Sequence, residues 1–384
     1  MMMRGWAFML ALGCTMGLVR GADLSPMTIV LDELDREIVR LVEEGVIVGG
    51  QWAMCRDGEF FVSLGYGLVG EESERGVDEE TLFLVGSCSK PFASMVVLSL
   101  VNDERVEIGL GDEIDGWLPE FGGKSVRGGG KAERAPTVAE LLGHRAGIYS
   151  QKVGMTKAQA RWIRDFGVSL EESAEGIASF PLIAMPGERY AYSGAGYCVL
   201  GRVAEEASGQ AFEALLQARV CEPLGLERTT FFPWGQFSGE EIATGAGGGS
   251  APHRLGEGHR LPLIGGSLYS TAEEMALFGQ GVMAEWGEGG GERVFDLAPE
   301  LVEALGTPLS VGSGYGLGWK VAEREGEPVR LTHSGALQSY RAWLGVNLET
   351  GISLAACWTL GTASGGERGA LSELLQRALL EDLE

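Results

Sequence analysis

The sequence has few of the residues that build metal centres and disulfide frameworks: 6 of its 384 residues are cysteine and 4 are histidine. No pair of cysteines or histidines has the spacing of a zinc site, so we expect neither a metal ion nor a cofactor. Without Cys14, an odd number of cysteines remains, spread along the chain, which argues against a disulfide framework. Cys55, Cys198 and Cys357 lie in apolar runs and are predicted to be small core residues.

Basic residues are also scarce. Lysine and arginine total 30 against 54 aspartates and glutamates, which gives a formal net charge of -24. Nucleic acids and anionic membrane surfaces repel such a chain, so neither is an expected partner. A hydrophobic content of 45% is that of a globular protein.

Residues 1–22 resemble a secretory signal peptide. Arg4 supplies the positive n-region, residues 5–19 supply the apolar region, and Val19 with Gly21 forms an acceptable cleavage site. The apolar run is too short for a stable membrane span, so we expect an exported protein, periplasmic or secreted. Cys14 leaves lipid anchoring open as an alternative, although the residues before it are in poor order for a lipobox.

The length and the order of the elements predict the architecture. A single core stops growing near about 250–300 residues, so this chain favours two lobes. Strand-like segments lie near both ends of the chain and helical segments lie in the middle. We predict an α+β fold: an antiparallel sheet of N- and C-terminal strands, from residues 23–86 and 310–384, flanked by the terminal helices. Residues 87–309 would form a mainly helical inserted lobe of the same domain, which spans 23–384.

Sequence periodicity predicts the individual elements. Apolar residues at helical spacing indicate a first helix over 29–44, and the turn signal at 56–58 indicates a hairpin. Thr137 and Glu140 have the spacing of a capping box, and Ser270 or Thr271 is expected to cap a later helix. The other predicted elements are strands over 46–55, 60–69, 315–322, 329–332, 340–347 and 352–360, and a last helix over 372–383.

Ser87 is the first candidate for chemistry. It follows the apolar run 81–85 and precedes residues 91–101, which are predicted to form a buried helix. Lys90 would lie on the same helix face, where an amine of lowered pKa can take the proton of a serine hydroxyl. By itself, the Ser-x-x-Lys pattern is more typical of a helix-capping serine followed by an exposed lysine.

Further motifs in order along the chain favour the chemical interpretation. Residues 186–197 contain Tyr192-Ser193-Gly194, and residues 333–336 read His-Ser-Gly-Ala. Together with Ser-x-x-Lys, they resemble the three motifs of the serine β-lactamase and penicillin-binding protein superfamily. The resemblance is to its branch of class C β-lactamases, DD-carboxypeptidases and related esterases. Additional matches, in the family's order, lie at 141–148, 223–226, 265–271 and 315–319.

The resemblance covers nearly all of the mature chain and implies the sheet-plus-helical-insert fold of that family. It also implies that Ser87 is the nucleophile, Lys90 its proton partner and Tyr192 the base or proton shuttle. The N–H of Ser87 would form an oxyanion hole with the N–H of Ala336. Ala336 is the last of four residues that match the family's substrate-binding strand: His333, Ser334, Gly335 and Ala336.

Two positions depart from the family pattern. Gly194 stands where the family has an asparagine that donates to a substrate amide, and His333 replaces a lysine that attracts a substrate carboxylate. Arg341, on the next predicted strand, either compensates for that lysine or is a solvated strand residue. His144 is interpreted as a structural residue at a helix end, and Cys88 as a packing residue beside the nucleophile.

We therefore expect a serine hydrolase that forms an acyl-enzyme with an ester or an amide, of the esterase or D-amino-acid peptidase type. The expected partner is a small-molecule or peptide substrate, and the sequence predicts no oligomeric state. The alternative is a catalytically silent protein that binds cell-wall peptides or β-lactams as a sensor. The choice among ester, D-amino-acid peptide and β-lactam stays open.

Overall fold

A six-stranded antiparallel sheet forms the centre of the protein. The computed structural model describes residues 26–151, 155–246, 255, 258–287, 292–310, 312–363 and 369–380. The N-terminal hairpin joins the C-terminal strands through the pair β1–β8, so the strand order is β2–β1–β8–β7–β6–β5. This arrangement confirms the predicted α+β fold. The strands are β1 (Ile47–Arg56), β2 (Glu59–Gly67), β5 (Lys320–Arg324), β6 (Glu327–Leu337), β7 (Tyr340–Asn347) and β8 (Ile352–Leu360).

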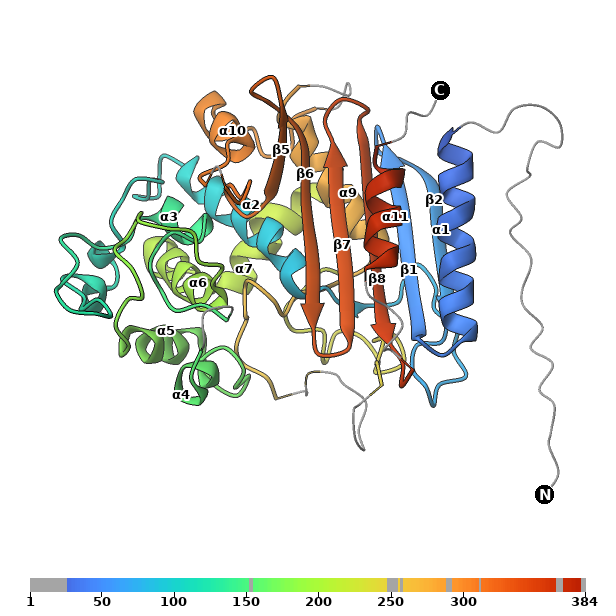
Figure 1. Cartoon of the computed structure of the whole chain (residues 1–384), viewed down its shortest axis with the longest axis horizontal. Helices are drawn as coiled ribbons and strands as arrows, with labels where there is room; N and C mark the ends of the chain where they lie inside the picture. Colours follow the sequence, from blue (N-terminus) through green and yellow to red (C-terminus); the bar gives the residue numbers. More distant parts are fainter. Residues whose placement is uncertain are drawn as a thin grey trace.

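Helices cover both faces of this sheet (Figure 1). On one face, α1 (Pro26–Glu43) and α11 (Ala370–Ala378) lie side by side, and Leu34 and Ile38 of α1 share a core cluster with Trp52 and Trp343. On the other face, α9 (Ala272–Ala284) packs against β1, β7 and β8. Strand β8 is buried along its whole length, as expected for a strand that is covered on both faces.

The middle of the chain forms a helical lobe beside the sheet (Figure 1). Its longest helix, α6, packs against two shorter helices, α3 and α5. The helices of this region are α2 (Ser89–Val101), α3 (Val138–Leu142), α4 (Lys157–Arg161), α5 (Leu170–Ala178), α6 (Gly194–Ser208), α7 (Phe212–Leu216), α8 (Glu222–Leu224) and α10 (Pro299–Gly306). Shorter elements are the 3-10 turns η1 (Gly86–Cys88), η2 (Ile114–Gly116) and η3 (Pro119–Phe121), the π-helical turn η4 (Gln217–Cys221), and the paired strands β3 (Phe83–Leu84) and β4 (Tyr269–Ser270).

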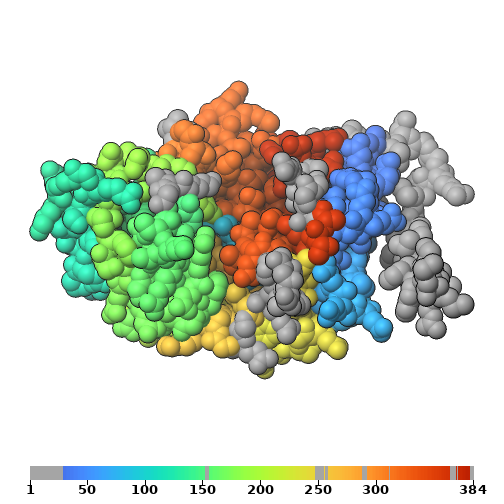
Figure 2. All heavy atoms as spheres, turned by 60° about the horizontal axis from the view of Figure 1, so that its bottom comes forward, coloured from blue at the N-terminus to red at the C-terminus, as the bar shows by residue number. Residues whose placement is uncertain are grey.

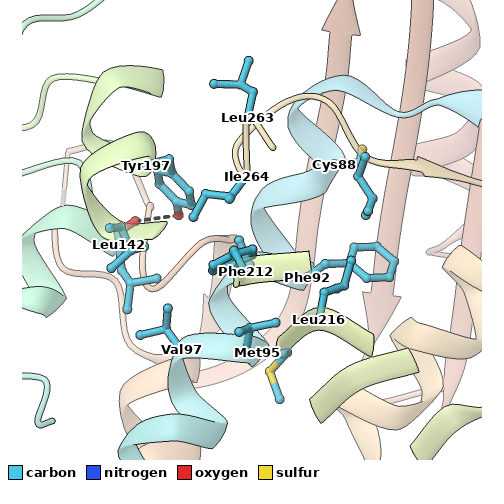
Figure 3. Packing of buried hydrophobic residues seen from close by; sticks show 14 of the residues in the cluster. Cys88, Phe92, Met95, Val97, Leu142, Tyr197, Phe212, Leu216, Leu263 and Ile264 are labelled. Carbon is cyan, nitrogen blue, oxygen red and sulfur yellow. Dashed lines mark hydrogen bonds between the residues drawn. The ribbon is translucent and has the colours of Figure 1, made fainter. Parts of the chain in front are cut away.

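Helix α2 connects the sheet to the helical lobe. Its residues from Ser89 to Leu100 are all buried, so it is a central helix without a polar face. Phe92 stacks on Phe278 of α9 with ring centroids 3.7 Å apart, while Met95 and Val97 lie among residues of the helical lobe (Figure 3). This packing fixes the N-terminal end of α2, two residues after Ser87.

Most predicted elements are present, with differences in the C-terminal half. β7 and β8 begin and end where predicted, and side-chain caps are present at Thr137 and Thr271. The strand predicted from residue 315 is wrong at its start, because the chain turns at Gly318, which has a φ of 83°, and β5 begins at Lys320. β6 extends to Leu337 and so contains residues 333–336. α9 falls within the predicted range of the helical lobe but packs on the sheet.

The ends of the chain and the cysteines complete the comparison with the sequence. The predicted signal peptide, including Cys14, lies outside the described residues. Among the helices of the described ranges, none is both long and apolar enough to cross a membrane. The cysteines in these ranges are free and buried, and Cys55, Cys198 and Cys357 belong to the main core cluster, as predicted.

Candidate active site

Ser87 lies in the 3-10 turn η1, directly before α2. The turn is held by Ser89, whose Oγ donates to Gly86 O at 2.6 Å and accepts from Leu268 N at 3.2 Å. Ser87 itself is partly exposed, whereas the residues on both sides of it are buried. The fold therefore presents the Ser87 side chain to solvent from an otherwise buried helix entry.

Lys90 lies next to Ser87, as the Ser-x-x-Lys spacing predicts. Its Nζ donates to Ser87 Oγ at 3.2 Å and to Gly265 O at 2.6 Å. Burial lowers the pKa of Lys90 to about 7. Near neutral pH a large fraction of this amine is unprotonated and can accept the Ser87 proton.

The residue at position 265 has to be small to leave room for this amine. A Cβ at Gly265 would lie 3.1 Å from Lys90 Nζ and 3.0 Å from Tyr197 Cβ. The glycine therefore lets the 265–271 segment, which the sequence analysis singled out, run close to the amine.

Two tyrosine rings lie close to this amine, those of Tyr192 and Tyr197, the latter with its centroid 5.1 Å from Lys90 Nζ. Lys90 Nζ lies 4.7 Å from the centroid of the Tyr192 ring. Tyr192 precedes helix α6, and its carbonyl oxygen accepts a hydrogen bond from Ser150 Oγ at 2.6 Å. Ser193 caps α6, because its Oγ accepts from Gly196 N at 2.9 Å.

Three other tyrosines surround Tyr192, and burial raises the pKa of each. The pKa of Tyr190 is raised to about 12, and those of Tyr197 and Tyr315 lie well above the ordinary value of a phenol. Tyr197 OH donates to Leu142 O at 3.0 Å, as the dashed line in Figure 3 shows. These phenols stay protonated at neutral pH, which favours packing and hydrogen-bonding roles for Tyr190 and Tyr197.

Strand β6 turns polar backbone groups towards Ser87. A two-residue turn joins β6 to β7, and the residues that flank it, Leu337 and Tyr340, form a hydrogen-bonded pair. Along the hairpin, such pairs alternate with pairs whose N–H groups point away from the partner strand. By this alternation, the N–H groups of Ser334 and Ala336 point away from β7. β5 pairs with β6 only as far as Thr332. Within the described residues, the edge at 333–337 therefore carries no neighbouring strand and can receive a substrate.

Gly86 and Gly335 allow this edge to approach the serine. A Cβ on Gly86 would lie 2.6 Å from Ala336 N, and a Cβ on Gly335 would overlap Val85 O. Gly86 also has a φ of 54°, which L side chains rarely adopt. The N–H of Ala336 thus lies beside the turn that carries Ser87, as an oxyanion hole made from these two residues requires.

His333 lies at the cavity wall as a neutral, buried side chain. Its Nδ1 is 2.9 Å from Ser334 O and its Nε2 is 3.0 Å from Tyr315 OH. Since a carbonyl oxygen only accepts, Nδ1 carries the proton and Tyr315 OH donates to Nε2. Burial, together with the nearby Lys90, lowers the pKa of His333 to about 3. His333 therefore offers no positive charge to a substrate carboxylate at neutral pH.

A glutamine that the sequence analysis did not single out fills the space beside Gly194. Gly194 begins α6, and its N–H donates to Gln151 Oε1 at 2.9 Å. A Cβ on Gly194 would overlap Gln151 Nε2. A carboxamide is thus present where the family's asparagine is missing, but it comes from a segment 43 residues away in sequence. Sequence spacing alone does not reveal that a glutamine from another segment takes the place of the asparagine.

A cavity of about 560 Å³ lies between Ser87, Tyr192 and strand β6, and neither Lys90 nor Gly194 is among its lining residues. Figure 2 shows a hollow at the boundary between the green helical lobe and the orange and red strands. Arg341 lines the cavity and is partly exposed, with Nη1 donating to Gln338 O and Tyr340 O, so it is a cation at the margin. Lys320 is a second, exposed cation of the lining. The predicted residues in the lining are Ser87, Tyr192, His333, Ser334, Gly335, Ala336 and Arg341.

This arrangement of fold and site defines a class: a serine hydrolase with a Ser-x-x-Lys nucleophile on a sheet-plus-helical-lobe fold. A family model described as Beta-lactamase matches residues 34–376. The chain belongs to this family and is a serine hydrolase.

Hydrolases of several kinds are among the relatives. Esterase EstB of Burkholderia gladioli is 29% identical over an alignment of 400 positions, which covers 93% of this chain and 98% of the esterase. Among solved structures, EstCE1, a hydrolase with promiscuous acyltransferase activity, has a TM-score of 0.75 at 21% identity and covers 92% of this chain and 99% of its own. D-amino acid amidase of Ochrobactrum anthropi SV3 has a TM-score of 0.68 at 20% identity, with coverage of 92% and 98%. The two structural similarities support the fold.

Proposed function

We propose that the protein is an esterase that works through an acyl-enzyme on Ser87. The Ser87 hydroxyl proton passes to the Lys90 amine while Oγ forms a bond to the carbonyl carbon of the ester. The carbonyl oxygen becomes an oxyanion that accepts hydrogen bonds from the N–H groups of Ser87 and Ala336. When the intermediate collapses, the alcohol leaves with a proton delivered through Tyr192. Water then repeats the sequence and releases the acid.

The character of the site favours simple esters over β-lactams. The observation that carries this proposal is the neutral His333, held between Tyr315 and the backbone, on the strand that would bind a substrate carboxylate. The proposed preference for simple esters thus rests on a position that departs from the family motifs.

The test compares kcat/KM for p-nitrophenyl butyrate and for nitrocefin on the same purified protein. The proposal expects efficient hydrolysis of the ester and little hydrolysis of nitrocefin. Hydrolysis of nitrocefin at the efficiency of a dedicated β-lactamase, with negligible esterase activity, would overturn it. Lack of turnover on both substrates, with stable labelling by a fluorescent penicillin, would instead favour the silent sensor.

A second candidate, hydrolysis of D-amino-acid amides or peptides, rests on Gln151. Its Oε1 is engaged by Gly194 N, which leaves the Nε2 donors beside the start of α6 for a substrate carbonyl. D-amino acid amidase is one of the structural neighbours. A panel of D- and L-amino-acid p-nitroanilides separates this candidate from a simple esterase, because only an amidase cleaves them with a preference for one enantiomer.

We further propose that the protein is exported and acts outside the cytoplasm. The support is the signal-like composition of residues 1–22. Expression of the full chain, followed by fractionation and N-terminal sequencing, tests this proposal. A mature N-terminus near residue 23 in the periplasm or medium would support it. Retention of residues 1–22 on a cytoplasmic product would contradict it, and a lipid-modified Cys14 would point to the anchored alternative.

A further inference from the structure

His144 follows the short helix α3, with Gly143 between them, and its backbone has an unusual conformation. Its φ is 58°, in the left-handed region that residues other than glycine seldom adopt. The residue is 2% exposed. Its carbonyl oxygen accepts a hydrogen bond from Ala191 N at 2.8 Å. The backbone of His144 thus holds the residue that precedes Tyr192.

The His144 side chain holds the residue that follows Tyr192. Its Nδ1 accepts a hydrogen bond from Ser193 N at 3.1 Å. A ring nitrogen that accepts is unprotonated, so the proton of the neutral imidazole is on Nε2. His144 therefore binds the main chain on both sides of Tyr192, once with its carbonyl oxygen and once with its ring.

The imidazole also contacts the Tyr192 ring directly. The two ring centroids are 4.3 Å apart, with an interplanar angle of 47°. Lys90 Nζ lies 4.7 Å from the same Tyr192 centroid. The Tyr192 ring therefore contacts both the His144 imidazole and the Lys90 amine, which exchanges protons with Ser87 in the proposed mechanism.

We propose that His144 is a positioning residue for acyl transfer, which sets the orientation of the Tyr192 phenol through the hydrogen bonds to Ala191 and Ser193. The inference rests on the proposed function, because it concerns the step in which Tyr192 carries a proton. The N–H of Ser193 needs a hydrogen-bond acceptor, because Ser193 is buried and only 3% exposed. A side chain at position 144 that only filled space would not supply that acceptor.

A double-mutant cycle tests this inference, with the acylation rate for p-nitrophenyl butyrate as the readout. His144→Leu removes the acceptor and is expected to lower kcat by about 10–100-fold, with KM changed by less than about threefold, since displaced catalytic groups lose rate. In the Tyr192→Phe background, His144→Leu should lower kcat by less than about threefold, because residues that act together are not additive.

Two further variants keep the test decisive. His144→Asn retains an oxygen acceptor and tolerates the positive φ, so it should keep kcat within about fivefold of the wild type. His144→Gly suits the backbone but lacks the acceptor. It takes the place of His144→Leu in the cycle if circular dichroism shows that the leucine variant does not fold.

His259 is the matched control. It is also buried, and its Nε2 lies 2.7 Å from Phe231 O, but it packs between Phe166 and Phe232, outside the lining of the cavity. His259→Leu is expected to lower the melting temperature and leave kcat unchanged.

Additive losses in the double variant would overturn the inference, as would a folded His144→Asn protein as slow as His144→Leu. Failure of the proposed function itself gives a different result. In that case the wild-type protein would not hydrolyse p-nitrophenyl butyrate. Ester hydrolysis by Tyr192→Phe at the wild-type rate would instead remove the Tyr192 assignment, and this inference with it, while the esterase proposal would stand.

Discussion

At the scale of single residues, the buried amine of Lys90 makes activity depend on pH. Its pKa is lowered to about 7 by burial, and only the unprotonated amine can take the Ser87 proton. We expect kcat/KM for p-nitrophenyl butyrate to rise with pH and level off above an apparent pKa near 7. Tyr192→Phe should be slower but keep this apparent pKa. A flat profile from about pH 5 to 9 would contradict the role of Lys90.

The same shift affects stability with a defined sign. The unfolded chain would keep the Lys90 proton up to an ordinary lysine pKa of about 10.4, whereas the folded protein releases it near pH 7. The unfolded state therefore binds more protons in this window, and the contribution of Lys90 to stability rises with pH there.

The phenol next to the amine gives a second prediction at this scale. Tyr192→Phe should lower the acylation rate by about 10²–10⁴-fold, the usual contribution of a positioned acid–base group. Tyr190→Phe is the matched control and should lose far less, because burial raises the pKa of Tyr190 to about 12. Stopped-flow measurement of nitrophenol release checks both variants. Equal losses would remove the reason to choose Tyr192.

The space at Gly194 supports a third prediction, on substrate choice. Gly194→Asn alone should be impaired, because its Cβ would overlap Gln151 Nε2. The double variant Gly194→Asn with Gln151→Ala opens that space and should shift the kcat/KM ratio of nitrocefin to p-nitrophenyl butyrate upward. A new hydrogen bond of about 1 kcal/mol predicts a several-fold shift. An unchanged ratio in the folded double variant would show that this position does not select substrates.

The sequence predicts local motifs at this site and leaves out the contacts between distant segments. Ser87 and Lys90 are three residues apart on one helix entry, so their proximity follows from spacing alone. Gln151 reaches Gly194 through tertiary packing, which no short motif reveals. The neutral state of His333 likewise depends on Tyr315, which lies in a separate segment.

At the scale of elements, the site depends on the approach of β6 to the turn η1. Gly335→Ala should push β6 away, because its Cβ would overlap Val85 O. A displacement of about 1 Å can cost 10²-fold in rate, so kcat/KM should fall by about that factor. Gly116→Ala is the control, since a Cβ there meets nothing within 4 Å. Wild-type esterase activity in Gly335→Ala would contradict the placement of the oxyanion hole.

The ends of helices and strands could be predicted from the sequence where an apolar run is bounded by clear turn residues. β7 and β8 are apolar runs bounded by turns, and both match their predicted limits. The segment from Tyr315 has the same apolar pattern, but the chain turns at Gly318 before β5 begins. The placement of α9 on the sheet could not be predicted, because a buried helix has the same apolar pattern in either lobe.

At the scale of the whole molecule, the two lobes share one core. The largest cluster of buried residues in the described ranges includes Ala355 of β8, Phe92 of α2 and Leu200 of α6. We therefore expect a single cooperative unfolding transition, in which the calorimetric and van't Hoff enthalpies agree. Differential scanning calorimetry checks this expectation. Two resolved transitions would show that the helical lobe and the sheet unfold independently.

The central claim is that Ser87 becomes acylated, and intact-mass spectrometry tests it most directly. The protein is incubated with a fluorophosphonate, and the modified peptide is then mapped. The account predicts one adduct, located on Ser87, formed in parallel with the loss of esterase activity and absent from a folded Ser87→Ala variant. An adduct on another residue at full stoichiometry, or unchanged labelling and hydrolysis in Ser87→Ala, would contradict it.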